Sequence, residues 1–230
     1  MHLNSELLFK KYLSSHFKPN MKVLEIGADR LPTWYCETVG DPSIDWYTLD
    51  IQTHWDTLAI SKNNSASNKQ LVSKHEYNYP VEDNTFDVVF SGQVMEHVKN
   101  IWKWMDELKR ITKPGGLIIT ILPVSWPYHV APEVVDCWRI YPDGMKALLE
   151  DKGLEIMLNT FESLEKNLIP SHVPTLPGVG VDTLADLQKS KYKVIFSYYK
   201  LLSLFPGLKK LRRPIPVAYD AVCIARKPQR

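Results

Sequence analysis

Cysteine is scarce in this chain of 230 residues, which contains only Cys36, Cys137 and Cys223. Their odd number and wide separation argue against a disulfide framework and against a structural zinc site. No uninterrupted apolar run reaches about 18 residues, so the sequence predicts no transmembrane helix. Residues 1–13 have no apolar core followed by small residues, which argues against a signal peptide. We therefore expect a cytoplasmic protein.

An excess of charge of either sign is also missing. The 28 Lys and Arg residues nearly balance 26 Asp and Glu residues, so the formal net charge is only +2. Such a chain has no overall electrostatic attraction to nucleic acid, and we expect no nucleic-acid partner. Aromatic residues, by contrast, are plentiful, with seven Trp and eleven Tyr. They could form the walls of a site for flat or sugar-like ligands, or they could serve the core and surface.

Strand-like and helix-like segments alternate along most of the chain. A helix over residues 101–111 is expected to bury Ile101, Trp102, Met105, Leu108 and Ile111. This alternation predicts an α/β fold with a doubly wound, mostly parallel sheet, while 61–69 reads as a polar loop. The other expected helices cover 3–13, 34–39 and 141–152, and the expected strands cover 21–26, 46–50, 71–76, 86–90, 117–124, 154–161 and 219–225.

The segment from 165 to 216 does not follow this alternation. It contains a Pro/Gly-rich portion, an apolar helix over 192–205 and the basic sequence LKKLRR at 208–213. Because it is far longer than an ordinary connection between strands, we interpret it as an insertion in a single domain of residues 1–230. Three roles compete: a lid or substrate wall, which we favour, a homodimer contact, or a weak contact of 191–213 with a membrane surface.

Ligands of open parallel sheets bind outside the carboxyl ends of the strands. The first strand ends at Glu25 and is followed by Gly27, where the backbone can approach a ligand closely. The second strand ends at Asp50, a carboxylate suited to a ribose diol. Asp29 and Leu31 occupy the positions where a dinucleotide-binding loop has further glycines, and Asp29 would repel a pyrophosphate. This loop therefore favours S-adenosyl-L-methionine, which has no phosphate.

Three segments and one aspartate carry a family resemblance: VLEIGADRLP at 23–32, Asp50, YPVEDNTFDVVFSGQVMEHV at 79–98 and LKRITKPGGLIITILP at 108–123. In this order they resemble the class I S-adenosylmethionine-dependent methyltransferases, of the type 11-like group, over residues 20–160. The resemblance implies a Rossmann-like sheet with an antiparallel last strand, a cofactor-binding half at 20–125 and S-adenosyl-L-homocysteine as product. The chain departs from the family in keeping only Gly27 of a glycine-rich loop.

The resemblance also implies which residues bind the cofactor. Asp50 would bind the ribose and Ile51 would pack on the adenine. Glu76 and Tyr77 fall at the family's acidic adenine contact, although His75 aligns about as well. Four residues would lie at the methionine end of the cofactor: Glu25, Gly27, Ala28 and Gln93.

Methyl transfer to a hydroxyl needs a group that removes its proton, and histidine suits this near neutral pH. His129 lies five residues past the fifth strand, and His97 is the second catalytic candidate. The loop that carries His129 also contains four candidate substrate residues, Trp126, Tyr128, Asp136 and Arg139. We expect no metal site, because no His, Asp and Glu residues have a convincing ligand spacing.

The loop around His129 also resembles, more loosely, loops of methyltransferases that modify sugars and surface glycans. We therefore expect O-methylation of a hydroxyl on a sugar, sugar nucleotide or surface glycan. One alternative is methylation of another small molecule, such as a quinone-like compound or secondary metabolite. Another is a non-catalytic binding protein that retains the fold. No Asn/Asp-Pro-Pro-aromatic signature follows the fourth strand, which argues against methylation of base amino groups.

Overall fold

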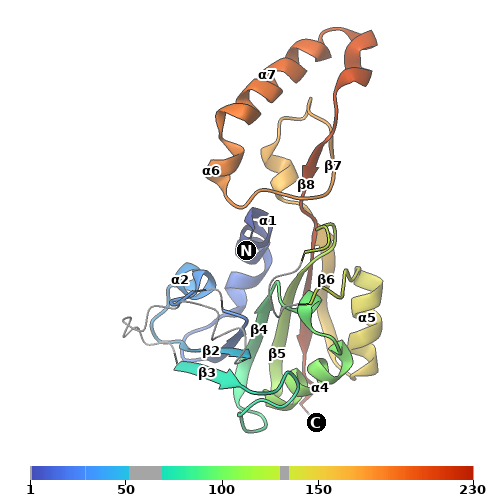
Figure 1. The fold of residues 1–230 in the computed structure, drawn as a ribbon. Coiled ribbons are helices and arrows are strands. Elements are labelled where there is room, and N and C mark those ends of the chain that lie inside the picture. The colour runs from blue at the N-terminus through green and yellow to red at the C-terminus, as the bar shows by residue number, and fades with distance from the viewer. Residues whose placement is uncertain (1, 29, 52–68, 130–134, 230) are drawn as a thin grey trace.

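A seven-stranded sheet forms the centre of the computed structural model, which describes residues 2–28, 30–51, 69–129 and 135–229 (Figure 1). The strand order is β3-β2-β1-β4-β5-β9-β6. Only β9 runs antiparallel to its neighbours β5 and β6, so the expected mostly parallel sheet with an antiparallel last strand is confirmed. The strands are β1 (Lys22–Ile26), β2 (Asp45–Ile51), β3 (Lys69–Ser73), β4 (Phe86–Gly92), β5 (Thr112–Pro123), β6 (Glu155–Glu162) and β9 (Asp220–Arg226).

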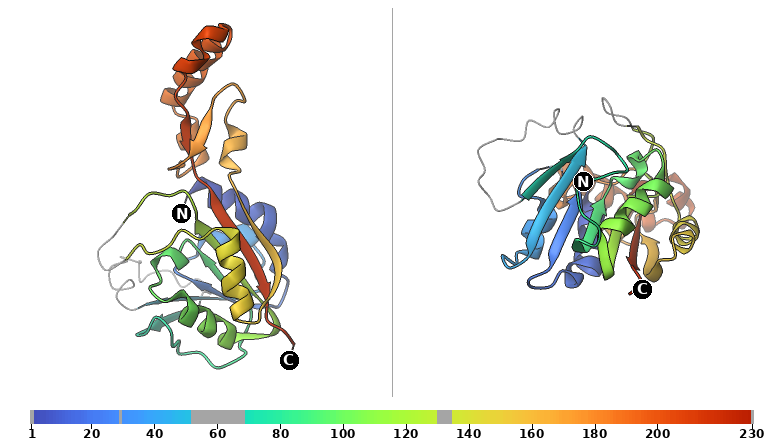
Figure 2. Two further views of the ribbon diagram at one scale, coloured as in Figure 1. Left: turned by 90° about the vertical axis from the view of Figure 1, so that its right-hand side faces the viewer. Right: turned by 90° about the horizontal axis from the view of Figure 1, so that it is seen from below.

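Helices cover both faces of this sheet (Figure 2). On one face lie α1 (Leu3–Leu8), continued by a π-helical turn (Phe9–Leu13), and α2 (Trp34–Val39); on the other lie α4 (Ile101–Ile111) and α5 (Pro142–Asp151). Side chains alternate across the strands: Val88 and Phe90 face the first layer, and Val89 faces the second. The central strands of the sheet, such as β1 and β4, are therefore buried on both sides.

Three local expectations were wrong. In α4, Trp104 is buried and Trp102 is 45% exposed, because the Trp104 indole can donate to the Tyr79 hydroxyl (2.7 Å) within the core. The third strand ends at Ser73, not at residue 76, because the Ser73 hydroxyl and the His75 backbone form a turn. The fifth strand begins at Thr112, five residues early, since Thr112 pairs with Phe86 ahead of an irregularity in the register. Residues 61–68 of the expected loop lie outside the described residues, and its last residue, Lys69, begins β3.

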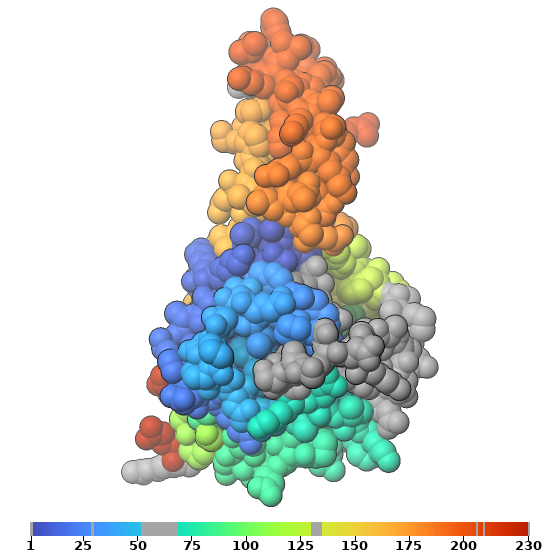
Figure 3. All heavy atoms as spheres, turned by 90° about the vertical axis from the view of Figure 1, so that its left-hand side faces the viewer, coloured from blue at the N-terminus to red at the C-terminus, as the bar shows by residue number. Residues whose placement is uncertain are grey.

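The insertion forms an arm that rises from the carboxyl edge of the sheet, between β6 and β9 (Figures 1 and 3). Its base is a pair of parallel strands, β7 (Thr175–Pro177) and β8 (Ile215–Val217). The helices α6 (Leu184–Leu187) and α7 (Ser190–Ser203) extend from this base. A small separate core, which includes Tyr199 and Leu202, holds the arm together. In the part of the chain that the structure describes, no helix is long and apolar enough to cross a membrane.

Candidate functional site

The ends of β1, β2 and β4 meet at the carboxyl edge of the sheet. β1 lies in the middle, with Ile26 paired to Leu49 on one side and to Ser91 on the other. The chain passes from β1 to β2 on one side and returns through β4 on the other, so this edge contains the point where the strand order reverses. Ligands of doubly wound sheets bind at such a point.

The loop after β1 is packed tightly at Gly27. This residue has φ +77° and donates its N–H to the Leu49 carbonyl (2.9 Å), and a Cβ atom here would lie 2.2 Å from Cγ2 of Val94. Only glycine fits both the backbone angle and this close approach. Ala28 is completely buried. The single glycine that remains of the loop is therefore at the position where a side chain cannot be accommodated.

Glu25 anchors this loop from within the protein. Its buried carboxylate accepts hydrogen bonds from the Trp46 indole (3.0 Å) and from the Thr33 hydroxyl (2.5 Å). Thr33 is also the N-cap of α2, because its hydroxyl accepts from the Cys36 N–H (3.1 Å). Neither Thr33 nor Trp46 was among the predicted site residues, although a Thr before a helix is a recognisable cap. The predicted contact of Glu25 with the cofactor stays a prediction.

Asp50 lies at the end of β2, as expected, and is only 6% exposed. Its carboxylate accepts the N–H of Ile51 (2.8 Å), and Ile51 is half-buried at the same edge. Glu76 and Tyr77 follow β3 and line an open depression together with His75. Lys99 lies 3.8 Å from Glu76, and the Tyr77 hydroxyl accepts from the Asn100 N–H (3.0 Å). The alternative alignment of His75 therefore remains open.

The side chain of Gln93, which follows β4, is directed at the buried polar residues Ser5 and Asp220. Its amide donates to the Ser5 hydroxyl (2.9 Å) and to the carboxylate of Asp220 (3.2 Å), which also accepts from Asn4 (2.7 Å). Burial raises the pKa of Asp220 to about 7. Asp220 was not among the predicted site residues, although a lone acidic residue at the start of an apolar strand is a visible signal.

His2 completes this group of buried polar side chains. Its Nε2 lies 3.4 Å from the Asp220 carboxylate, and its ring stacks on Trp126 with centroids 4.6 Å apart and an interplanar angle of 8°. Burial lowers the pKa of His2 to about 4, so its ring is neutral at pH 7. The indole of Trp126, a predicted substrate residue, is thus held against the first helix at the carboxyl edge.

Asp136 and Arg139 hold the loop after β5 in place. They form a two-pronged ion pair (2.5 and 2.7 Å), and Arg139 also donates to the carbonyls of Trp126 and Pro127. Asp136 accepts the N–H of His129 (2.8 Å), and the neighbouring Arg139 guanidinium lowers the pKa of Asp136 to about 2. Their observed bonds position the loop, whereas the ring of Tyr128, 76% exposed, is open to solvent.

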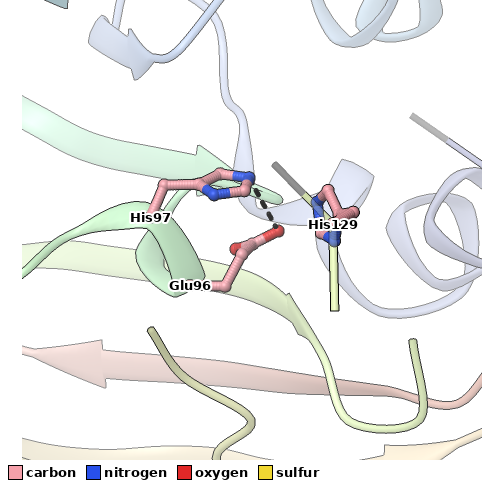
Figure 4. A group of neighbouring side chains, drawn as sticks. All are labelled: Glu96, His97 and His129. Atoms are coloured by element: carbon pink, nitrogen blue, oxygen red, sulfur yellow. Dashed lines mark ion pairs between the residues drawn. The ribbon is translucent and has the colours of Figure 1, made fainter. Parts of the chain in front are cut away.

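The two predicted catalytic histidines are neighbours, and a buried carboxylate lies beside them (Figure 4). The rings of His97 and His129 are 5.1 Å apart and nearly perpendicular, and His97 Nε2 is 3.7 Å from Glu96 Oε1. Burial raises the pKa of Glu96 to about 8 and lowers that of His97. One potential ligand atom from each of the three residues lies within 4.8 Å of the others. Sequence separation had hidden this cluster, because His129 follows His97 by an entire helix and strand.

Comparisons with known proteins find methyltransferases. Residues 25–120 match the family described as a methyltransferase domain. Over 80 residues, or 35% of this chain, the sequence is 36% identical to the demethylmenaquinone methyltransferase of Staphylococcus saprophyticus. The chain spans 33% of the length of that relative.

Two solved structures have the same fold over nearly the whole chain. A Haemonchus contortus phosphoethanolamine N-methyltransferase 2 in complex with S-adenosyl-L-methionine has a TM-score of 0.60 at 15% identity, covering 98% of this chain and 52% of that one. A SAM dependent methyltransferase from Aquifex aeolicus has a TM-score of 0.52 at 18% identity, with coverage of 97% and 89%.

Proposed function

Because the chain belongs to the class I S-adenosylmethionine-dependent methyltransferase family, we propose that it methylates a hydroxyl of a sugar, sugar nucleotide or surface glycan. S-adenosyl-L-methionine is its cofactor. One observation carries the proposed acceptor chemistry: His97 and His129 meet at the sheet edge where Gly27 and Asp50 also lie. A group that can accept a proton is thus available near the methyl donor.

In this proposal Asp50 accepts from the ribose hydroxyls, and Gly27 and Ala28 lie along the methionine part. Ile51 covers the adenine, and the depression at Glu76 and Tyr77 binds its polar edge. The position of Gly27 supports the first part, because its hydrogen bond to the Leu49 carbonyl places the loop next to the end of β2, where Asp50 lies. Gln93 acts through Asp220 and Ser5, its observed partners, and shapes the methionine end.

The sulfonium already activates the methyl group, so the protein must align the acceptor and take its proton. Nδ1 of His97 lies 2.6 Å from the Val135 carbonyl, which can only accept, so Nδ1 carries a proton. In the neutral ring Nε2 is then free to accept one. His129, half-buried beside it, is the second candidate base.

Aromatic and polar groups around this cluster support a sugar-like acceptor. Trp126 and Tyr128 offer ring faces, and Ser125 connects them to the arm by donating to the Gly178 carbonyl (3.1 Å). We propose that the base of the arm is a wall of the acceptor site. The relative named for demethylmenaquinone supports the alternative quinone-like acceptor. A dimer or membrane contact of the arm and a cytoplasmic location also stay predictions.

Cofactor binding tests the core of the proposal. Titration calorimetry with S-adenosylhomocysteine should show one site, and Asp50→Asn should weaken binding at least tenfold because the ribose loses a charged acceptor. Asp45→Asn is the matched control, since Asp45 begins the same strand at the opposite edge and should leave affinity unchanged. Failure of the wild-type protein to bind at millimolar ligand would refute the enzymatic function.

Acceptor chemistry needs its own assay. Transfer of labelled methyl groups should occur to a sugar nucleotide or glycan in a panel that also contains quinone-like compounds. His129→Gln should lower turnover by roughly 10²–10⁴-fold with unchanged S-adenosylhomocysteine affinity. Transfer to quinone-like compounds alone would select the alternative acceptor, and an unaltered rate in the variant would remove His129 from the reaction.

A further inference from the structure

We propose that Glu96, His97 and His129 form a binding site for one divalent transition-metal ion, which holds the acceptor hydroxyl for methyl transfer. The site deepens the proposed function and rests on it for the role of the ion, but ion binding itself can be measured separately. The three ligand atoms come from the turn after β4 and from the loop after β5 (Figure 4). Two imidazoles and one carboxylate make a donor set suited to such ions.

The histidine rings are oriented as metal ligands are. His97 donates from Nδ1 to the Val135 carbonyl, which leaves the lone pair of Nε2 directed at the Glu96 carboxylate, 3.7 Å away. Nδ1 of His129 lies 3.2 Å from the Pro127 carbonyl and 3.3 Å from Asp136, which favours its proton there and leaves Nε2 free. Arg139 also lies 3.4 Å from this Nδ1, but its protons already go to Asp136 and Pro127. Partners of this kind on the second nitrogen fix the ligating nitrogen of a histidine.

Glu96 provides the second, independent indication. The residue is 1% exposed, and its Oε2 has no hydrogen-bond partner among the residues that the structure describes. Leaving a buried polar atom without a partner is costly, and a buried carboxylate is normally paired or bound to a metal. A lone pair of His97 and a carboxylate oxygen also face each other here. Either a proton or a cation must lie between these two acceptors.

The separations fit an ion after a small adjustment. Two atoms bonded to one ion at about 2.1 Å can stand at most about 4.2 Å apart. The pair His97–Glu96 already meets this limit at 3.7 Å, and all three ligand atoms lie within 4.8 Å of one another. Side-chain rotation of the half-buried His129 can bring its nitrogen within the limit.

Three protein ligands would leave positions open for the acceptor. An acceptor hydroxyl bound there becomes more acidic and releases its proton to water. Its oxygen lone pair then forms the bond to the methyl carbon while the carbon–sulfur electrons stay on sulfur, giving the methylated oxygen and S-adenosylhomocysteine. With the ion bound, His97 and His129 act as ligands and not as bases.

Ion binding is tested on untagged, chelator-treated protein by calorimetry with Zn²⁺ and by electron paramagnetic resonance with Mn²⁺. We expect one ion per chain, and Zn²⁺ bound more tightly than Mg²⁺, because imidazole suits the former. Glu96→Gln and His97→Asn should each weaken binding at least tenfold. His16→Gln, a substitution outside the cluster, should bind as the wild type does.

S-adenosylhomocysteine titration and thermal melting of the same samples show whether each variant is folded. No stoichiometric binding to the wild type would overturn the metal site and show that a proton fills the gap. Equal binding by the folded Glu96→Gln variant would also overturn it, because the ion would then bind elsewhere. Ion binding by a protein that does not bind S-adenosylhomocysteine would instead refute the proposed function and leave the metal site standing.

Discussion

Among individual residues, Asp220 is placed where its charge is costly. It is completely buried between Asn4, Gln93 and His2, and burial raises its pKa from the ordinary 3.8 to about 7. Between these two pH values the folded chain keeps a proton that the unfolded chain has released. Stability attributable to this group is therefore greatest at low pH and is lost as the pH rises through about 7.

Asp220→Asn should remove this contribution. Thermal melts from pH 4 to 8 should show that the wild type loses stability relative to the variant as the pH rises, since an amide does not ionise. Asp143→Asn, an exposed change, serves as the control. Parallel melting curves of wild type and Asp220→Asn over the whole range would contradict the assignment.

At this scale the sequence predicted residues that follow strand ends but not residues that meet across the fold. Gly27 and Asp50 follow from strand patterns, because the parallel arrangement places those ends together. Asn4 and Asp220 are 216 positions apart, and no local pattern joins them. His129 and His97 were each chosen separately, whereas their contact depends on how the loop after β5 returns to the turn after β4.

Among the elements, the short helix α2 depends on its first residue. The Thr33 hydroxyl both caps the helix and donates to the buried carboxylate of Glu25. Thr33→Ala should therefore destabilise the protein by more than the about 1 kcal/mol of an ordinary cap, because Glu25 also loses a partner. Chemical denaturation measures this, with Thr33→Ser as the control that keeps the hydroxyl. Equal stability of the Ala and Ser variants would show that neither bond matters.

Element bounds followed the sequence closely where periodicity was strong. The helix expected over 101–111 has the same bounds as α4, because its apolar residues recur at helical spacing and Thr112 continues into the next strand. Which tryptophan it buries could not be read from spacing, since that choice depends on the distant Tyr79 hydroxyl. The early start of β5 was hidden because residues 113–116 look like a turn, yet Thr112 before them already pairs with Phe86 of β4.

On the scale of the whole molecule, the arm and the sheet have separate cores. Tyr199 is 9% exposed in the arm, and its hydroxyl donates to the Arg213 carbonyl (2.9 Å). Tyr199→Ala should lower the free energy of local unfolding of the arm by about 3–5 kcal/mol. The affinity for S-adenosylhomocysteine should stay unchanged. Hydrogen exchange should rise in residues 165–217 alone.

The neighbouring Tyr198→Ala is the control, because that ring is 51% exposed. Faster exchange in the sheet of the Tyr199→Ala variant would show that the two cores are not independent. The sequence indicated that 165–216 is an insertion, but not that it projects from the sheet, because its apolar helix fits a lid equally well.

The position of β9 has a consequence for how the chain is made. This strand fills the slot between β5 and β6, although the 57 residues from 163 to 219 separate it from β6 in the sequence. During synthesis, β5 and β6 therefore cannot form their hydrogen bonds to β9 until residues 220–226 have left the ribosome. The same late segment brings Asp220 to Asn4 and Gln93, so this buried polar group cannot form before residues 220–226 have left the ribosome. Pairings this distant in sequence fold slowly, and we expect the insertion of β9 to be a late step in the folding of the sheet.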